Sequence, residues 1–240
     1  SKVTISGKEF AVTSIGYKAF SYCDKLTSIV VESGNTVYDS RDNCNAIIET
    51  ATNTLIAGCN NTVIPNSVTS IGNSAFSSCL RLTSIEIPSG VTSIGGYAFV
   101  DCSSLTSIYC YAETVPETSQ DAFSGCPSNM VIYVPAQSAN DYNAKSPWKN
   151  YTIIALPCVV TASANPEDAG VITGTGEYEL SDTVTLTATA NEGYRFVSWI
   201  ENGVLVSIEE NYIFTIKGNR NLVANFEKTY EITARVNPEK

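Results

Sequence analysis

Internal repetition is the feature that most constrains how this chain can fold. Three segments align with one another without gaps, at Val12–Ile29, Val68–Ile85 and Val91–Ile108. Each begins with Val-Thr-Ser-Ile-Gly, carries Ala-Phe and a cysteine in its middle, and ends with Leu-Thr-Ser-Ile. A divergent fourth copy runs from Ala122 to Pro135, with Asn129 at the position of the leucine. A repeat of about 23 residues indicates a stack of similar coils that share one core, because a single coil cannot bury its own apolar side.

The residues of one repeat predict short strands and a tight turn. Apolar and polar residues alternate over Leu82–Ile87, as expected for a strand with one buried face, and Val91–Ile94 predicts a second short strand. The Ala-Phe pair that follows predicts a turn or short helix that carries the phenylalanine into the interior. The repeat spacing predicts parallel strands that begin near Leu26, Asn61, Leu82, Leu105 and Met130. It also predicts equivalent buried positions for Phe20, Phe76, Phe99 and Phe123.

Glycine and proline mark fixed positions of the repeat. Gly16, Gly72 and Gly95 recur where the chain needs a small residue or a positive φ. Pro65 and Pro88 follow apolar strand residues, and we expect them at corners where a missing N–H costs little.

Four of the eight cysteines occupy one position of the repeat, which indicates a structural role. They are Cys23, Cys79, Cys102 and Cys126. We expect a ladder of buried thiols, since free cysteine is among the most buried residue types. Coils stacked about 4.8 Å apart keep the Cβ atoms of such a ladder beyond the usual disulfide distance. The chain has no Cys-x-x-Cys pair and no histidine, so no metal site is predicted.

A longer unit separates the first repeat from the second. Its segments 46–50 and 54–58 predict a β-hairpin inserted into the repeat array. Cys44 and Cys59 fall opposite each other at the open end of that hairpin, a spacing that allows either a cross-strand disulfide or two free thiols. The segment Asp39-Ser-Arg-Asp42-Asn43 lacks the ordered ligand series of a calcium loop, and a solvated turn is the preferred interpretation.

The repeat pattern resembles the BspA-like leucine-rich repeats of surface proteins from oral and gut anaerobic bacteria. The resemblance covers residues 1–156, in which the segment from Pro135 to Leu156 is expected to cap the last coil. It implies a mainly β fold, with a leucine-rich-repeat solenoid of parallel strands and short helical turns. It also implies a non-catalytic protein on the bacterial cell surface.

The sequence after Leu156 predicts a small all-β module at residues 157–228. Residues 184–190 alternate as a strand, and Asn202-Gly203 predicts a type I′ hairpin turn. The motif around Asn165-Pro-Glu returns at Asn237, so residues 229–240 are predicted to begin a second, incomplete copy. The Gly-Tyr-x-Phe-x-x-Trp segment and the closing Ala-x-Phe resemble divergent internalin B-repeat modules, which implies a spacer or adhesion unit. Its core is expected to include Tyr194, Phe196, Trp199, Phe214 and Phe226.

Charge and composition exclude several classes of function. The net charge is −10 and lysine and arginine do not cluster, which argues against nucleic acid and anionic membrane as partners. No apolar run approaches the roughly 20 residues that span a bilayer. The absence of histidine excludes triads with a histidine base, and no Gly-x-Ser-x-Gly motif is present. We therefore expect no enzyme activity, no cofactor and no metal, and a secreted protein whose signal and anchor lie outside this chain.

One face of the predicted sheet is a candidate ligand-binding surface. In each strand, the residue between the last two apolar positions points away from the core. That position is held by Val63, Glu86, Tyr109 and Tyr133, and Ser84 and Ser107 lie two residues earlier on the same face. The resemblance makes this the concave face, where partners of leucine-rich repeats commonly bind. The alternative is a tyrosine ladder that only stiffens the sheet.

Three functions agree with these observations. The first is recognition or adhesion, in which the solenoid face binds a host or neighbouring-cell protein and the β module acts as a spacer. The second is a glycan-binding accessory protein, suggested by exposed tyrosines on an acidic, polar face. The third is a purely structural stalk. The sequence does not identify the ligand, the mode of anchoring or the oligomeric state.

Overall fold

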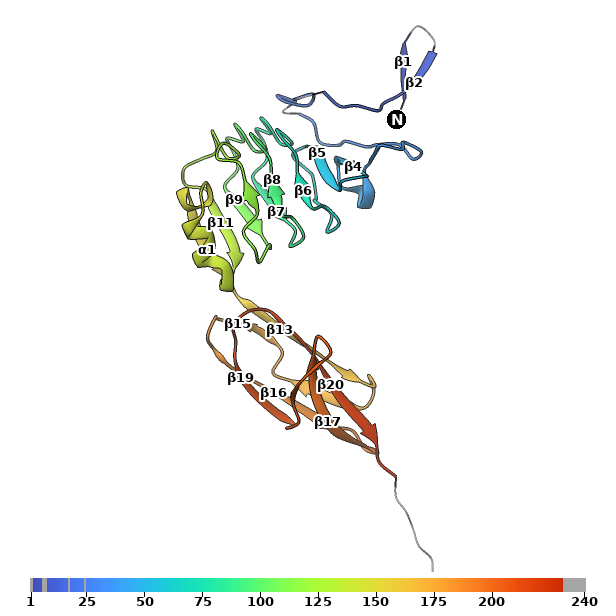
Figure 1. The fold of residues 1–240 in the computed structure, drawn as a ribbon, viewed down its shortest axis with the longest axis vertical. Coiled ribbons are helices and arrows are strands. Elements are labelled where there is room, and N and C mark those ends of the chain that lie inside the picture. The colour runs from blue at the N-terminus through green and yellow to red at the C-terminus, as the bar shows by residue number, and fades with distance from the viewer. Residues whose placement is uncertain (1, 6–7, 17, 24, 231–240) are drawn as a thin grey trace, which may run out of the picture. The chain divides into compact units, whose positions relative to one another are not determined.

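The structure is a computed structural model that describes residues 2–5, 8–16, 18–23 and 25–230, with side chains from residue 12 onward. Its contacts divide the chain into two compact units, Ser1–Leu156 and Pro157–Lys240 (Figure 1). The assignment of a repeat domain at 1–156 and a module at 157–228 stays a prediction. Most of the second module copy predicted at 229–240 lies outside the described residues.

Short strands in the N-terminal unit form two main sheets and one separate hairpin. The hairpin consists of β1 (Lys2–Ile5) and β2 (Lys8–Ala11). One main sheet has the strand order β10-β8-β6-β5-β4-β3, and the other has the order β12-β11-β9-β7. The strands of the six-stranded sheet are β3 (Tyr38–Asp39), β4 (Ala46–Glu49), β5 (Thr54–Gly58), β6 (Ser70–Ile71), β8 (Ser93–Ile94) and β10 (Glu117–Thr118). The strands of the four-stranded sheet are β7 (Ser84–Ile87), β9 (Ser107–Cys110), β11 (Val131–Pro135) and β12 (Thr152–Leu156).

The prediction of a mainly β chain is confirmed, but the sheets are mixed. All pairs of the four-stranded sheet are parallel, as are β5, β6, β8 and β10. In contrast, β3, β4 and β5 pair antiparallel, because β4 and β5 form the predicted hairpin. Three of the five predicted strand starts fall within two residues of β7, β9 and β11. The other two, near Leu26 and Asn61, are wrong, since no strand forms there in the described residues.

Tight turns, one of the two alternatives predicted from the sequence, carry the Ala-Phe pairs into the interior. In the second repeat, alternate N–H groups close turns within the coil, while the N–H groups between them reach the next coil. Phe76 thus donates to the carbonyl of Ala98 at 2.7 Å, and Ser78 donates to that of Val100 at 2.8 Å. This alternation needs left-handed backbone at Ser74 and Ser78, with φ of 57° and 59°. The turns therefore add a third hydrogen-bonded edge to the stack of coils.

The phenylalanines of the second, third and fourth repeats form a continuous ladder in the core. The rings of Phe76 and Phe99 stack at 5.0 Å between centroids, and those of Phe99 and Phe123 lie 5.8 Å apart. All three side chains are buried, as predicted. Met130, one residue after Asn129, is fully buried and fills the place of the missing leucine in the fourth copy.

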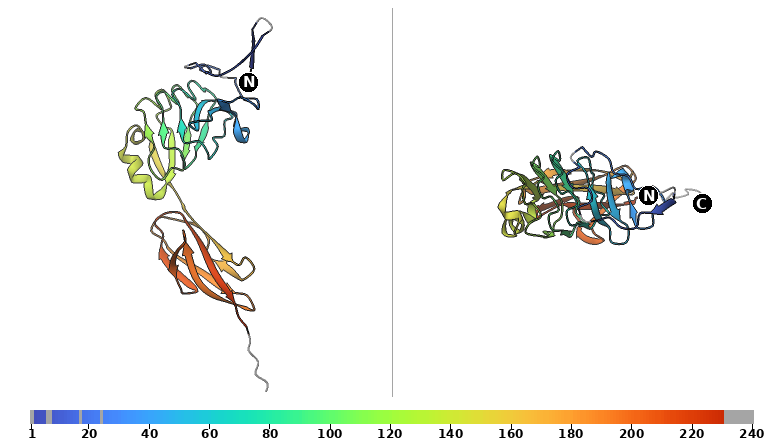
Figure 2. Two further views of the ribbon diagram at one scale, coloured as in Figure 1. Left: turned by 45° about the vertical axis from the view of Figure 1, so that its right-hand side comes forward. Right: turned by 90° about the horizontal axis from the view of Figure 1, so that it is seen from above.

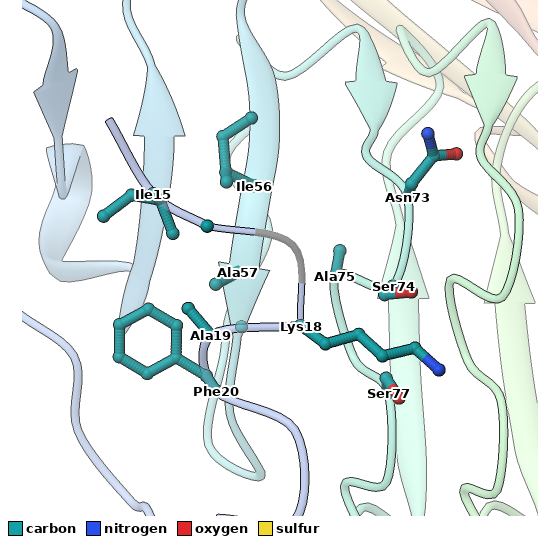
Figure 3. A pocket seen from close by; sticks show the side chains of 12 residues that line it. Ile15, Lys18, Ala19, Phe20, Ile56, Ala57, Asn73, Ser74, Ala75 and Ser77 are labelled. Atoms are coloured by element: carbon teal, nitrogen blue, oxygen red, sulfur yellow. The ribbon is translucent and has the colours of Figure 1, made fainter. Parts of the chain in front are cut away.

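The first repeat departs from the predicted register. Phe20 is only half-buried and Cys23 is exposed, so the predicted burial of both side chains is wrong. The hairpin β4–β5 stands between this repeat and the second one: the N–H of Gly58 donates to the carbonyl of Ala75 at 2.8 Å. Ile47 and Ala57 on the outer side of the hairpin join Phe20 in a separate apolar cluster. A hollow of about 230 Å³ remains between Phe20, β5 and Ala75 (Figure 3).

A short helical segment covers the C-terminal end of the coils (Figures 1 and 2). Its helices are η2 (Ala136–Ser138), α1 (Ala139–Ala144) and η3 (Trp148–Asn150). Trp148 is fully buried, with its ring edge-on to Phe123 at 5.1 Å. Tyr142 is also fully buried, and its hydroxyl donates to the carbonyl of Ala112 at 2.8 Å. These aromatic side chains shield the last coil from water.

The C-terminal unit consists of two sheets, with orders β15-β13-β20-β17-β18 and β14-β16-β19. Its strands are β13 (Cys158–Asn165), β14 (Gly170–Thr173), β15 (Gly176–Tyr178), β16 (Thr183–Ala190), β17 (Tyr194–Glu201), β18 (Val204–Ser207), β19 (Asn211–Thr215) and β20 (Arg220–Lys228). Asn202 and Gly203 both have positive φ, at 50° and 78°, which confirms the predicted hairpin turn. Trp199 and Phe226 are buried in the core, and Tyr194, Phe196 and Phe214 are half-buried.

Candidate functional site

The outward face of β7, β9 and β11 brings most of the predicted site residues into register. Ser84 pairs with Ser107, and Glu86 with Tyr109. Tyr109 in turn pairs with Tyr133 on β11. Apolar residues alternate with these positions and are buried, so the polar and aromatic side chains share the solvent side. The alternation follows from the two-residue period of a strand.

Two stacked tyrosines occupy the centre of this face. The rings of Tyr109 and Tyr133 lie 4.5 Å apart with an interplanar angle of 6°. The prediction that they stack in adjacent coils is confirmed. Ile154 on β12 pairs with Tyr133 and is 41% exposed, so it extends the apolar surface beyond the stack. The rings add contact area, and their hydroxyls supply polar tips.

A hollow of about 590 Å³ lies beside the tyrosines, between β7 and residues 62–66. Three predicted site residues line it, namely Val63, Ser84 and Glu86. Val63 is 71% exposed and contributes an apolar patch to the wall. Asp42, Asn66 and Tyr111 also line the hollow.

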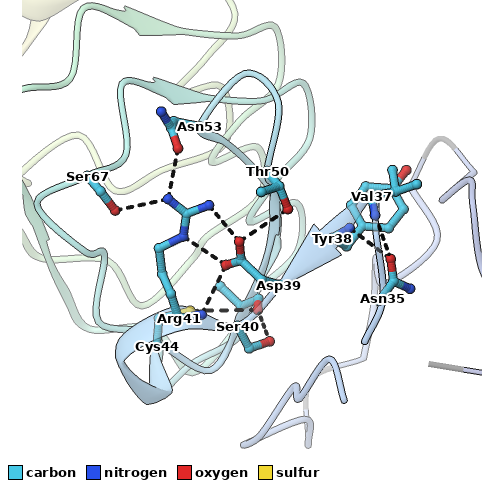
Figure 4. A network of polar contacts seen from close by, with 11 residues as sticks. Asn35, Val37, Tyr38, Asp39, Ser40, Arg41, Cys44, Thr50, Asn53 and Ser67 are labelled. Atoms are coloured by element: carbon cyan, nitrogen blue, oxygen red, sulfur yellow. Dashed lines mark hydrogen bonds and ion pairs between the residues drawn. The ribbon is translucent and has the colours of Figure 1, made fainter. Parts of the chain in front are cut away.

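A polar network fixes the loop that carries Asp42 to this hollow (Figure 4). The guanidinium of Arg41 donates to both carboxylate oxygens of Asp39, with Nε–Oδ1 and Nη2–Oδ2 distances of 2.8 and 2.6 Å. Its Nη1 atom donates to Asn53 at 2.8 Å. These contacts hold the pKa of Asp39 below its ordinary value, chiefly through the hydrogen bond from Arg41. The turn η1 (Arg41–Asn43) is therefore tied to the hairpin, with Asp42 at φ 58°.

Sequence reasoning missed Tyr111 and Asp42. Tyr111 is 39% exposed and follows Tyr109 by two residues, so continuing the strand alternation by one step past β9 would have found it. Its pKa is raised by burial and by the nearby Glu86 and Tyr109. Asp42 comes from a loop outside the repeat, and no periodic signal marks it.

Disulfide formation and metal binding are two further roles to consider for the cysteine and acidic side chains. Cys44 and Cys59 are free, buried thiols. Of the two alternatives left open by the sequence, the structure therefore has the two free thiols and not the cross-strand disulfide. Among the described residues, no group of three or more histidine, cysteine or acidic side chains is placed to hold a metal. The face itself presents hydroxyls, phenols and carboxylates, groups that bind through hydrogen bonds, charge and aromatic contact.

Comparison with known proteins identifies the repeat. A family model described as BspA type leucine rich repeat region matches residues 1–54 and 46–145, in six copies. The chain belongs to the BspA-type leucine-rich repeat family. In this BspA-type chain a second model, the divergent InlB B-repeat domain, matches residues 160–230. Both resemblances stated from the sequence are thereby confirmed. Neither family is a catalytic one, and the BspA-type repeat is typical of surface proteins.

One solved structure is similar to part of this BspA-type chain. It is the crystal structure of a leucine rich cell surface protein from Faecalibacterium prausnitzii A2-165, with 30% sequence identity and a TM-score of 0.40. The similarity covers 52% of this chain and 40% of that protein, so the chain matches less than half of its length. A search of curated proteins found no match. In the described part of the chain, no helix is long and apolar enough to cross a membrane.

Proposed function

We propose that this chain is a recognition module that binds a host or neighbouring-cell protein through the outward face of β7, β9 and β11. The observation that carries the proposal is the stacked pair Tyr109–Tyr133 directly beside the hollow lined by Glu86 and Tyr111. Aromatic side chains are frequent anchors of protein interfaces, and an adjacent hollow offers a place for a partner side chain. Ser84 and Ser107 add hydroxyl groups to the same face.

The proposal places the protein outside the cell, on a bacterial surface. Membership of the BspA-type family supports this location. The second unit then acts as a spacer, a role supported by its match to the InlB B-repeat family. The acidic net charge of −10 disfavours nucleic acid and anionic lipid as ligands of either unit.

A binding screen with two matched double variants tests the proposal. The whole chain is applied to an array of extracellular-matrix proteins and to a glycan array. Tyr109→Ala/Tyr133→Ala is expected to weaken binding to a protein ligand by tenfold or more while the far-UV spectrum stays unchanged. Tyr22→Ala/Tyr230→Ala removes two exposed tyrosines elsewhere, and it is expected to bind as the parent does.

Each alternative function has its own signature in this screen. A double variant that loses stability but keeps its affinity shows that the stack only stiffens the sheet, and removes the face as a binding site. Binding on the glycan array alone supports a glycan-binding accessory protein. The amide of Asn66, the carboxylate of Asp42 and the hydroxyl of Tyr111 in the hollow favour this function. Binding on neither array, with normal display on cells, supports a structural stalk.

A further inference from the structure

The outer edge of β7 has backbone groups that the sheet does not use. The carbonyls of Thr83 and Ile87 accept from Ser107 and Tyr111, so the odd-numbered residues of this stretch face β9. In a parallel strand the groups of the intervening residues point the opposite way. Ser84 and Glu86 therefore direct their N–H and C=O groups away from β9. In the described residues no protein group pairs with these four backbone atoms, because β7 is the last strand of its sheet.

Residues 61–64 stand where the repeat would place the next strand, but they are bonded elsewhere. Thr62 and Ile64 are buried, and Asn61 and Val63 are exposed, the same alternation as in β7. The N–H of Val63 donates to the carbonyl of Cys44 at 3.0 Å, and the hydroxyl of Thr62 donates to that of Asn45 at 2.8 Å. These bonds tie the segment to the hairpin unit. They leave the hollow of about 590 Å³ between this segment and β7.

The hollow is acidic. Asp42 and Glu86 line it, and none of the described lining residues is a lysine or arginine. Arg41, the residue before Asp42, donates hydrogen bonds from its guanidinium to Asp39, Asn53 and Ser67. The negative charge of Glu86 also contributes to the raised pKa of the neighbouring Tyr111 hydroxyl. A ligand that brings positive charge is therefore complementary to this site.

We propose that the free edge of β7 binds an extended, basic segment of the partner protein as an added strand, with alternate lysine or arginine side chains directed at Glu86 and Asp42. Strand addition satisfies the four free backbone groups of Ser84 and Glu86, and it places every second side chain on the side of Glu86. Four residues of β7 span about 13 Å, the length of a four-residue strand. This inference rests on the proposed function and specifies the chemistry of the partner.

Two peptides and amide hydrogen exchange test the mode of binding. The probes are the capped hexapeptides Lys-Val-Lys-Val-Lys-Val and Glu-Val-Glu-Val-Glu-Val. In the free protein, the amides of Ser84 and Glu86 are expected to exchange faster than those of Ile85 and Ile87, which face β9. The lysine peptide is expected to bind and to slow exchange at Ser84 and Glu86 at least tenfold. The glutamate peptide is expected not to bind.

Substitutions in the protein separate backbone pairing from charge. Ser84→Pro removes an N–H that the sheet does not use, and is expected to weaken binding of the lysine peptide about tenfold, or ~1.4 kcal/mol. Ser84→Ala removes the same hydroxyl but keeps the N–H, so the tenfold loss in Ser84→Pro is measured relative to this variant. Asp42→Asn/Glu86→Gln is expected to weaken binding at least fivefold and to reduce its salt dependence. Glu167→Gln/Asp168→Asn makes the same charge change in the other unit and is the matched control.

Several results would overturn strand addition. No binding of the lysine peptide at millimolar concentration does so, as does binding without protection of Ser84 and Glu86. Equal affinity of the two peptides, or loss of affinity in Glu167→Gln/Asp168→Asn as large as in the site variant, removes the charge argument. The proposed function fails separately, when Tyr109→Ala/Tyr133→Ala keeps full affinity for a protein ligand. A protein ligand that depends on the tyrosines but not on Ser84 leaves the recognition face intact and refutes only the added strand.

Discussion

At the scale of single residues, the position of each phenylalanine in the stack determines what it contributes. Phe99 is fully buried between the rings of Phe76 and Phe123. Phe99→Ala is therefore expected to lower the free energy of unfolding of the N-terminal unit by about 3–5 kcal/mol. Phe20→Ala, at the same position of the repeat but only half-buried, is expected to cost far less. Urea denaturation of both variants measures the difference, and equal losses would mean that Phe20 also lies in the main core.

The cysteines at the shared repeat position also differ in burial from one copy to the next. The thiol of Cys102 donates to the carbonyl of Phe76 at 3.1 Å and is fully buried. Burial raises the pKa of Cys79 to about 12 and that of Cys126 to about 12, so neither thiol forms the reactive thiolate near neutral pH. Cys23 is exposed.

Alkylation by iodoacetamide at pH 8 follows from these environments. In the native protein Cys23 is expected to react first, while Cys79 and Cys102 react only in urea. Mass spectrometry of peptides after a short pulse measures the modification at each site. Fast modification of Cys102 in the native state would contradict the buried ladder.

At the scale of elements, one glycine position of the repeat is tightly packed in one coil and open in another. A Cβ atom at Gly95 would lie 2.7 Å from the backbone nitrogen of Asn73, whereas a Cβ atom at Gly16 would meet nothing within 4 Å. Neither glycine has positive φ, so close approach of the coils, rather than backbone conformation, explains Gly95. Gly95→Ala is expected to cost about 1–3 kcal/mol through overpacking, and Gly16→Ala to stay within about 0.5 kcal/mol of the parent. Thermal unfolding of the matched pair tests this, and a tolerated Gly95→Ala would disprove the contact between coils.

What the sequence predicted correctly at this scale depends on local periodicity. The alternation in Leu82–Ile87 fixes which side chains of β7 face the core, and the repeat spacing places Tyr109 beside Tyr133. The hairpin at β4–β5 also follows from its own residues. These features need no knowledge of distant contacts.

The parts that the sequence did not predict depend on contacts between units of unequal length. The first repeat carries the full motif, yet Gly58 of the hairpin bonds to Ala75 and takes the place that the first coil would have occupied. The same unit draws Thr62 and Val63 away from β7, which creates the hollow. Asp42 reaches that hollow through the ion pair of Arg41 with Asp39, an arrangement with no repeat signature.

At the scale of the whole molecule, the two compact units have separate cores. The chain contains two tryptophans: Trp148 lies in the N-terminal unit and Trp199 in the C-terminal unit, and both are fully buried. Each tryptophan therefore reports on the packing of one unit. Leu186, fully buried on β16, has the same role in the second core as Phe99 has in the first.

We expect the two units to unfold independently, because each is compact and has its own buried residues. In a Trp199→Phe background, fluorescence follows Trp148, and Phe99→Ala should lower the midpoint of that thermal transition while Leu186→Ala leaves it unchanged. In a Trp148→Phe background the order is reversed, with Leu186→Ala costing about 2–5 kcal/mol in the C-terminal unit. If each substitution shifts both transitions by similar amounts, the two units fold as one cooperative body. The second unit could then not act as a spacer that stays folded independently of the recognition face.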